Sequence, residues 1–278
     1  MAITDQKKKA EQFRALHNAA DVLVLPNAWD VASARIVQQA GFPAVATTSA
    51  GIAFSLGYAD GQKIPPEEMF AAVRRIARAV KAPVTADAEA GYGSAPEDAA
   101  RTAHRVIESG AVGMNFEDAT GDPSHPLFDL ALQVERILAI REAANRDGVP
   151  IVLNARTDVY LAQVGDPGTR YDETVRRLSA YRDAGADCVF APGVRDSETI
   201  ERLVADLRGP LNILAGPGTP AVDELARLGV KRISLGSGVM RAAMGFLRRL
   251  AGELKTSGTY RTLDDAPSYA QMNELMRS

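Results

Sequence analysis

The sequence predicts an α/β protein that folds as a single (β/α)8 barrel of the TIM type. Eight short apolar runs each precede a longer helical stretch, and no linker rich in Pro, Gly or Ser interrupts this alternation. The length of 278 residues also suits one barrel. No G-x-G-x-x-G segment follows the first run, which disfavours the alternative, an open doubly wound sheet. We expect one domain over 1–278, with the barrel proper at 20–254.

The eight runs are short and mostly apolar, as expected for parallel strands that helices cover. The expected strands are Val22–Leu25, Ala44–Thr47, Val84–Ala88, Gly113–Glu117, Ile151–Ala155, Cys188–Ala191, Asn212–Leu214 and Arg232–Leu235.

Capping residues mark the helices between the strands. A helix over Val31–Gln39 has Asp30 as its N-cap and Gly41 just beyond its end. Two more helices begin with proline followed by acids, at 65–68 and 95–98, and extend to Lys81 and Gly110. Later helices are expected at about 130–145, 170–184, 197–207, 220–228 and 238–254.

An additional amphipathic helix is expected at 262–278, after the eighth unit. Leu263, Met272, Leu275 and Met276 would form its apolar face. Such a face needs a partner surface, and a second subunit is one source of it.

Composition excludes several classes of protein. Hydrophobic residues make up 46% of the chain, which rules out disorder, and the net charge of −3 provides no general basic field for nucleic acid or an anionic membrane. The single cysteine, Cys188, excludes a disulfide framework and reads as a small buried hydrophobe. With no apolar run of about 18 residues and no secretory signal, we expect a cytoplasmic protein.

Acidic residues gather where two neighbouring strands end. Asp87 and Glu89 are two apart and are expected on one face of the third strand, and Glu117 ends the fourth. Three converging carboxylates without His or Cys favour Mg²⁺, or Mn²⁺, over zinc. The alternative is that they cap the next helices or pair with arginines and lysines of the barrel.

The fifth strand ends with Asn154 and Arg156 on one face. The planar guanidinium of Arg156 matches a carboxylate or phosphonate group, so both residues are candidates for substrate binding. The alternative for Arg156 is a salt bridge to Glu117, and the two roles are compatible.

Small and hydroxyl residues follow the second strand. Thr48, Ser49 and Gly51 would let backbone N–H groups approach an anion closely, although an ordinary turn fits equally well. Asp60 stands in a turn flanked by glycines, a position where aspartate is more often structural than catalytic.

The loop 119–129 after the fourth strand is long and rich in Gly and Pro, as in lids that exclude water. It carries His125, a candidate acid or base, for which the alternative is a solvated loop histidine. His17 and His104 fall in expected helices and are assigned structural roles.

In these segments the chain resembles the isocitrate lyase and phosphoenolpyruvate mutase superfamily. The resemblance extends from about residue 20 to 250. The matching stretches are Pro26–Asp30 with Ser33–Arg35, Thr47–Gly61, Asp87–Gly93, Phe116–Asp118 and Asn154–Asp158.

The resemblance implies a (β/α)8 barrel that exchanges its C-terminal helix with a partner subunit, as a homodimer or homotetramer. It implies Mg²⁺ near Asp87 with support from Glu89 and Glu117. It further implies that the backbone amides of Thr48 and Ser49 contact the substrate. Other implied roles are assistance to the metal shell by Asp60 and binding of the substrate carboxylate by Arg156.

Two departures from the family pattern stand out. Glu89 replaces the second metal-site aspartate and is one methylene longer. The Lys-x-Cys-Gly-His motif of the lyases is absent, since His125 occupies the cysteine position and Pro123 the lysine position. The Lys-x-Asn-Ser pattern of the mutases is absent as well.

We therefore expect a Mg²⁺-dependent C–C lyase or decarboxylase that acts on a small 2-oxo or 2-hydroxy acid through a pyruvate enolate. Its partner would be a small-molecule carboxylate, with no nucleic acid or membrane. One alternative is phosphoenolpyruvate or phosphonopyruvate mutase, or phosphonopyruvate hydrolase. Another is a catalytically degenerate barrel that binds a metabolite.

Overall fold

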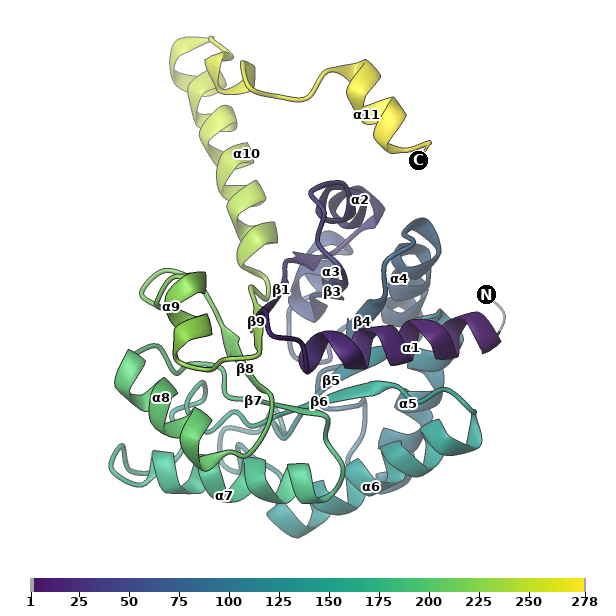
Figure 1. Ribbon diagram of the computed structural model, residues 1–278. Helices are drawn as coiled ribbons and strands as arrows, with labels where there is room; N and C mark the ends of the chain where they lie inside the picture. The colour runs from purple at the N-terminus through teal and green to yellow at the C-terminus, as the bar shows by residue number, and fades with distance from the viewer. Residues whose placement is uncertain (1–2, 278) are drawn as a thin grey trace.

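Parallel strands form a barrel with helices around it in the computed structural model, which describes residues 3–277 (Figure 1). The predicted fold class is confirmed, and all eight expected strands are present with ends shifted by one residue at most. In barrel order, the strands are β1 Leu23–Leu25, β9 Arg232–Ser234, β8 Leu211–Leu214, β7 Cys188–Phe190, β6 Val152–Arg156, β5 Gly113–Glu117, β4 Val84–Asp87, β3 Val45–Thr47 and β2 Asn27–Ala28.

The first strand of the barrel is split, which the sequence did not predict. Its first half, β1, pairs with β9, and its second half, β2, pairs with β3. Pro26 lies between them and has no N–H to donate. Asn27 joins the two sides, because its amide nitrogen donates to the carbonyl of Thr47 and its oxygen accepts from the N–H groups of Leu235 and Gly236, each at 2.8 Å.

The helices begin and end largely where the capping residues predict. Asp30 caps α2 in a capping box with Ser33, and Gly110 ends α5 with a φ of 89°. A short helix, α3, follows β3, where the sequence left an ordinary turn and an anion-contacting loop as equal alternatives. The helices are α1 Ile3–His17, α2 Val31–Gln39, α3 Ser49–Ser55, α4 Pro66–Ala79, α5 Pro96–Ser109, α6 Leu130–Arg146, α7 Arg170–Asp183, α8 Ser197–Asp206, α9 Val222–Arg227, α10 Gly238–Ser257 and α11 Tyr269–Leu275.

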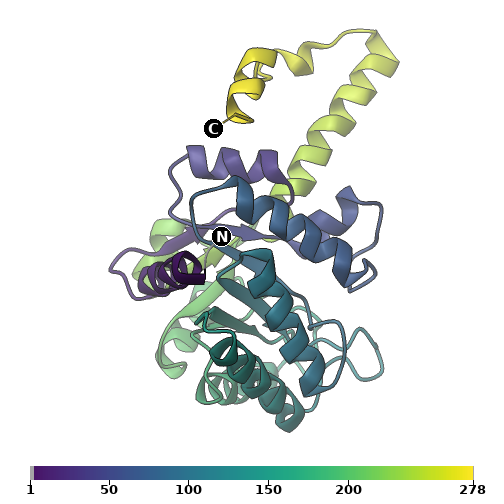
Figure 2. The same ribbon diagram turned by 90° about the vertical axis from the view of Figure 1, so that its right-hand side faces the viewer.

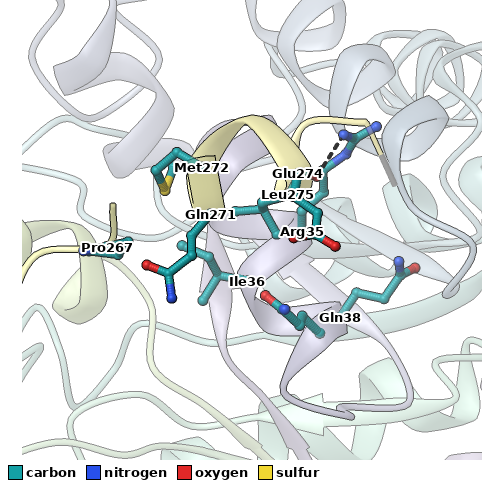
Figure 3. A pocket seen from close by; sticks show the side chains of 9 residues that line it. Arg35, Ile36, Gln38, Pro267, Gln271, Met272, Glu274 and Leu275 are labelled. Carbon is teal, nitrogen blue, oxygen red and sulfur yellow. Dashed lines mark hydrogen bonds between the residues drawn. The ribbon is translucent and has the colours of Figure 1, made fainter. Parts of the chain in front are cut away.

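The C-terminal segment extends away from the barrel and returns to it. Figure 2 shows α10 projecting outward and α11 lying over α2. The helix expected at 262–278 is not continuous: a 3-10 turn, Arg261–Leu263, is separated from α11 by an irregular stretch, and residue 278 lies outside the described residues. A cavity of about 590 Å³ lies between α2 and α11, where Arg35 donates to the carbonyl of Leu275 at 2.9 Å (Figure 3). No helix within residues 3–277 has both the length and the apolarity needed to cross a membrane.

Helix α1 packs against the end of the barrel opposite the strand C-termini. Gly113 has to be glycine there, because a Cβ would lie 2.8 Å from the Phe13 ring. His17, also on α1, contacts the buried guanidinium of Arg232 at 3.3 Å through Nε2 and the carbonyl of Phe13 at 2.8 Å through Nδ1. A carbonyl can only accept, so Nδ1 carries a proton, and a guanidinium can only donate, so Nε2 carries none and His17 is neutral. Its structural role is confirmed.

We predict that His17 makes the fold sensitive to acid. Burial, and then the charge of Arg232, lower the pKa of His17 to about 4. Between pH 6.5 and 4 the unfolded chain therefore binds a proton that the folded chain does not, and stability falls as the pH falls. From pH 7.5 to pH 5 this contribution amounts to about 2 kcal/mol. Urea unfolding at the two pH values should show His17→Gln losing that much less stability than wild type; equal losses would contradict the assignment.

Candidate active site

Three charged residues end three consecutive strands of the barrel. Asp87 ends β4, Glu117 ends β5 and Arg156 ends β6. In the strand register, Asp87 pairs with Asn115, and Glu117 pairs with Arg156. The carboxyl ends of the strands form the face of such barrels where active sites lie. The side chains that the sequence analysis singled out on β4, β5 and β6 are therefore brought together there.

Asp87 is oriented by the junction between β3 and α3. Its Oδ2 accepts from the backbone N–H and the hydroxyl of Ser49, at 3.0 and 2.8 Å. Its own N–H donates to the hydroxyl of Thr47 at 2.9 Å. The other oxygen, Oδ1, is buried without a hydrogen-bond partner. A buried unpaired carboxylate oxygen is costly, and it suits a ligand to a hard cation.

Arg156 is held by two carboxylates. Its Nη1 lies 2.6 Å from Glu117 Oε2, so the salt bridge considered from the sequence is confirmed. Its Nε and Nη2 donate to the two oxygens of Asp158, at 2.5 and 2.8 Å. Burial alone would lower the pKa of Arg156, but the charges of Glu117 and Asp158 raise it instead. The sequence analysis gave Asp158 no role. Its position two residues after Arg156 was the one signal that could have indicated a contact between the two side chains.

Glu89 does not lie on a strand as expected. Strand β4 ends at Asp87, and Glu89 adopts a left-handed backbone conformation with a φ of 48°, so strand alternation does not extend to it. Its two carboxylate oxygens accept from the N–H of Gln62 at 2.5 Å and from the hydroxyl of Tyr92 at 3.2 Å. Burial and the charge of Asp87 raise the pKa of Glu89 to about 7.

The site carries more negative charge than its arginine can balance. Burial raises the pKa of Glu117, and Arg156 only partly opposes this effect. Asp60 lies on an exposed loop, yet partial desolvation and the charge of Asp87 raise its pKa as well. The interacting carboxylates gathered around the one guanidinium of Arg156 are those of Asp60, Asp87, Glu89, Glu117 and Asp158.

Such an excess of buried negative charge calls for a cation or for protons. Within residues 3–277, no three His, Cys, Asp or Glu side chains are arranged closely enough to enclose a metal ion. Mg²⁺ does not require such a cage, since it keeps several waters and takes one or two carboxylates together with substrate oxygens. The acidic donor set and the unpaired Oδ1 of Asp87 therefore fit Mg²⁺.

The backbone N–H groups that were expected to contact an anion form hydrogen bonds to other groups of the chain instead. The N–H of Thr48 donates to the carbonyl of Ala28, and that of Ser49 donates to Asp87. The N–H of Gly51 donates to the Thr48 hydroxyl, which caps α3. Substrate contact by Thr48, Ser49 and Gly51 remains a prediction.

Two further candidates lie apart from the carboxylates. Asn154 is fully buried inside the barrel, where its amide nitrogen donates to Asn115 Oδ1 at 2.8 Å and its oxygen is unpaired. His125 stands on the exposed part of the loop 119–129, with its side chain 85% exposed and Nδ1 at 3.0 Å from the Ser124 hydroxyl. Their proposed roles in substrate binding and proton transfer also remain predictions.

Asp118 forms the hydrogen-bond network beneath the site. The sequence analysis assigned it no structural role. It is completely buried and accepts from the Tyr181 hydroxyl at 2.6 Å, the Thr157 hydroxyl at 2.7 Å and the Asp158 N–H at 2.9 Å. Arg177 lies 3.2 Å from it and also donates to the carbonyl of Phe128. Asp118 thereby fixes the residue that fixes Arg156. Each contact spans at least 39 residues of sequence, so no local pattern points to it.

Comparison with known proteins assigns the family. The sequence profile of phosphoenolpyruvate phosphomutase matches residues 13–255, and the chain belongs to this family, within the PEP mutase/isocitrate lyase superfamily. It is 35% identical to the uncharacterized protein Rv1998c of Mycobacterium tuberculosis over 81% of each chain. It is 28% identical to 2-methylisocitrate lyase of Bacillus subtilis over 92% of this chain and 85% of that one.

Similar solved structures agree with this family assignment. A Burkholderia cenocepacia protein provisionally described as a lyase/mutase has 40% identity and a TM-score of 0.93, covering 99% of this chain and 98% of its own. A 2,3-dimethylmalate lyase has 32% identity and a TM-score of 0.84, covering 96% and 94%. Phosphonopyruvate hydrolase, in a complex with oxalate and Mg²⁺, has 26% identity and a TM-score of 0.84, covering 97% and 95%. The homologues are thus lyases, mutases and hydrolases, which supports an enzyme of this family.

We predict that Asp118→Asn destabilises the protein strongly. The change leaves Arg177 without its buried counter-charge and places an amide NH2 where donors converge, which should cost about 3 kcal/mol in urea unfolding. Asp122→Asn, on the exposed loop nearby, is the matched control and should leave the unfolding midpoint unchanged. A loss for Asp118→Asn no larger than that of the control would contradict its organising role.

Proposed function

We propose that this protein is a Mg²⁺-dependent carbon–carbon lyase or decarboxylase for a small 2-oxo or 2-hydroxy carboxylic acid. The observation that carries the proposal is the excess of carboxylates around Arg156, together with the unpaired buried Oδ1 of Asp87. When bound here, Mg²⁺ would polarise the substrate's keto oxygen and stabilise the enolate that bond cleavage leaves. Mn²⁺ has the same ligand preferences and is proposed as a substitute.

Asp87 and Arg156 have different roles in this proposal. Asp87, whose Oδ2 is held by Ser49, would offer its unpaired Oδ1 to the cation. Arg156, already oriented by Asp158 and Glu117, binds the substrate carboxylate with the N–H groups that it does not use in these pairs. This preorientation lowers the entropic cost of positioning the substrate.

Proton transfer falls to residues on the two loops. We propose that Asp60, which interacts electrostatically with Asp87 and Arg156, transfers a proton to or from the reacting carbon of the substrate. His125 would act when the loop 119–129 bends toward the barrel, since it stands exposed in the present conformation.

The names of the relatives support cleavage of a carbon–carbon bond, with phosphonate chemistry as the alternative reaction class. Relatives named 2-methylisocitrate lyase and 2,3-dimethylmalate lyase favour the C–C lyase assignment. The family description and the phosphonopyruvate hydrolase favour phosphonate chemistry instead, and the assay below separates the two.

We also propose a homo-oligomer in the cytoplasm. Helix α10 exposes Met244, Leu247 and Leu254, and α11 sits on α2 across a cavity, as expected of a segment that can exchange between subunits. A monomer mass in light scattering would contradict the exchange. The cytoplasmic location is supported by the single cysteine, Cys188, which is buried and unpaired.

Side-by-side assays with Mg²⁺ test the reaction class. We expect turnover of oxaloacetate or of a branched 2-hydroxy dicarboxylic acid such as 2,3-dimethylmalate, followed as release of the 2-oxo acid product. Phosphonopyruvate is the comparison substrate. Turnover of phosphonopyruvate alone would replace the lyase proposal by the phosphonate alternative. Failure of Mg²⁺ and oxalate to bind in calorimetry would favour the non-catalytic barrel.

Substitutions test the roles of the site residues. Asp87→Asn removes the charge nearest the cation and should lower Mg²⁺-dependent activity by about a hundredfold or more. His125→Ala should lower kcat by only about tenfold, because water takes over part of the proton transfer. Glu11→Gln, on the exposed face of α1, is the control and should match wild type. Full activity in Asp87→Asn would disprove the assigned site.

A further inference from the structure

Two segments at the site are fastened to each other by Gln62, Glu89 and Tyr92, which we call the latch. The N–H of Gln62 donates to Glu89 Oε2 at 2.5 Å, and the N–H of Tyr92 donates to Gln62 Oε1 at 2.6 Å. The hydroxyl of Tyr92 donates to Glu89 Oε1 at 3.2 Å. These three bonds form a closed ring that joins the loop between α3 and α4 to the turn after β4.

The latch holds its backbone in an unfavourable conformation. Its residues Gln62, Glu89 and Tyr92 have φ angles of 59°, 48° and 54°, and Gln163 is the one other non-glycine residue within 3–277 that has a positive φ. Residues with a Cβ rarely adopt a positive φ. They keep it when the contacts around them hold the backbone in place. Such strain is concentrated at functional sites.

The latch determines where Asp60 lies. Asp60 stands two residues before Gln62 on a loop that is mostly exposed from Phe54 to Gly61. Gln62 bonds through both its backbone and its side chain, so the loop cannot shift at this point without breaking two hydrogen bonds. Asp60 is thereby kept among the charges of Asp87 and Arg156.

The latch also gives different roles to Asp87, which ends β4, and to Glu89, which lies two residues later. Each oxygen of Glu89 accepts from a latch donor, whereas Asp87 keeps Oδ1 unpaired. Both oxygens of Glu89 thus take part in the latch, and any turn of this carboxylate toward another partner would break the bonds that hold the strained loop.

We propose that Gln62 is a positioning residue that holds Asp60 at the site, and that Glu89 serves as the acceptor of this latch instead of a direct ligand to the cation. The part that concerns Asp60 and the cation rests on the function proposed above. The part that concerns the latch does not, and it can be measured in the metal-free protein.

Gln62→Asn tests the latch itself. Asparagine tolerates the left-handed backbone and keeps the N–H that donates to Glu89, but it is one methylene too short to reach the N–H of Tyr92. In hydrogen exchange of the metal-free protein, we expect amides 57–64 to exchange about tenfold faster, as expected when one hydrogen bond that holds a loop is lost.

The matched control is Gln163→Asn, the same substitution at the other left-handed glutamine. It should leave the exchange of 57–64 as in wild type. Unchanged exchange in Gln62→Asn, or equal acceleration in both variants, would overturn the latch. Because this measurement needs neither metal nor substrate, it stands even if the proposed reaction is wrong.

Glu89→Gln and Asp87→Asn test the division of roles. With Mn²⁺ titrated by calorimetry, we expect Asp87→Asn to weaken binding about tenfold more than Glu89→Gln does. Glu89→Gln should accelerate exchange of 57–64, as Gln62→Asn does, because an amide NH2 cannot accept from a latch donor. Equal losses of Mn²⁺ affinity with unchanged loop exchange in Glu89→Gln would make Glu89 a ligand and overturn the proposal. Absence of Mn²⁺ binding in wild type would count against the proposed function, while the exchange of Glu89→Gln would still decide the latch.

Discussion

The repulsion among carboxylates at the mouth of the barrel is the constraint on which the surrounding structure depends. Burial deprives these groups of water, and together with the neighbouring negative charges it raises the pKa of Glu89 and of Glu117. The chain answers with a specific partner for each group. Asp158 forms a two-point pair with Arg156, Ser49 donates twice to Asp87, and the latch donors hold Glu89. After these contacts, Asp87 Oδ1 still has no hydrogen-bond partner, and the site still has an excess of negative charge. A divalent cation complements both properties.

Two buried arginines form no ion pair with the carboxylates of this arrangement. Burial lowers the pKa of both Arg136 and Arg232 to about 10, and within residues 3–277 neither forms an ion pair with a carboxylate. Arg136 instead donates to the carbonyls of Ala90 and Gly93 and lies over the Phe128 ring at 4.0 Å. The turn after β4 is thus fixed through its backbone carbonyls, without an ion pair to Arg136.

The fold could be predicted from the sequence because its evidence is local. Apolar runs, N-caps and helix-ending glycines repeat at short range, and each strand-end residue such as Glu117 or Arg156 follows from its strand. The prediction failed where the chain leaves regular structure: alternation was extended from Asp87 to Glu89 although the strand had ended and the backbone had turned left-handed. Gln62 and Asp118 act through partners 27 or more residues away, and no spacing in the sequence encodes such contacts.

The loop 119–129 shows how a shared barrel can support different reactions. Its base is rigid, because Arg177 links Asp118 to the carbonyl of Phe128, and Ala119 pairs with Leu127 as a short antiparallel bridge. Its tip is a small self-contained turn in which Asp122 accepts from Ser124, and His125 faces solvent. Contacts of the base determine where the loop starts and ends, and contacts of the tip remain within the tip. Substitutions at the tip, His125 included, can therefore change the chemistry of the loop without disturbing the contacts of Asp118 or the carboxylates around Arg156.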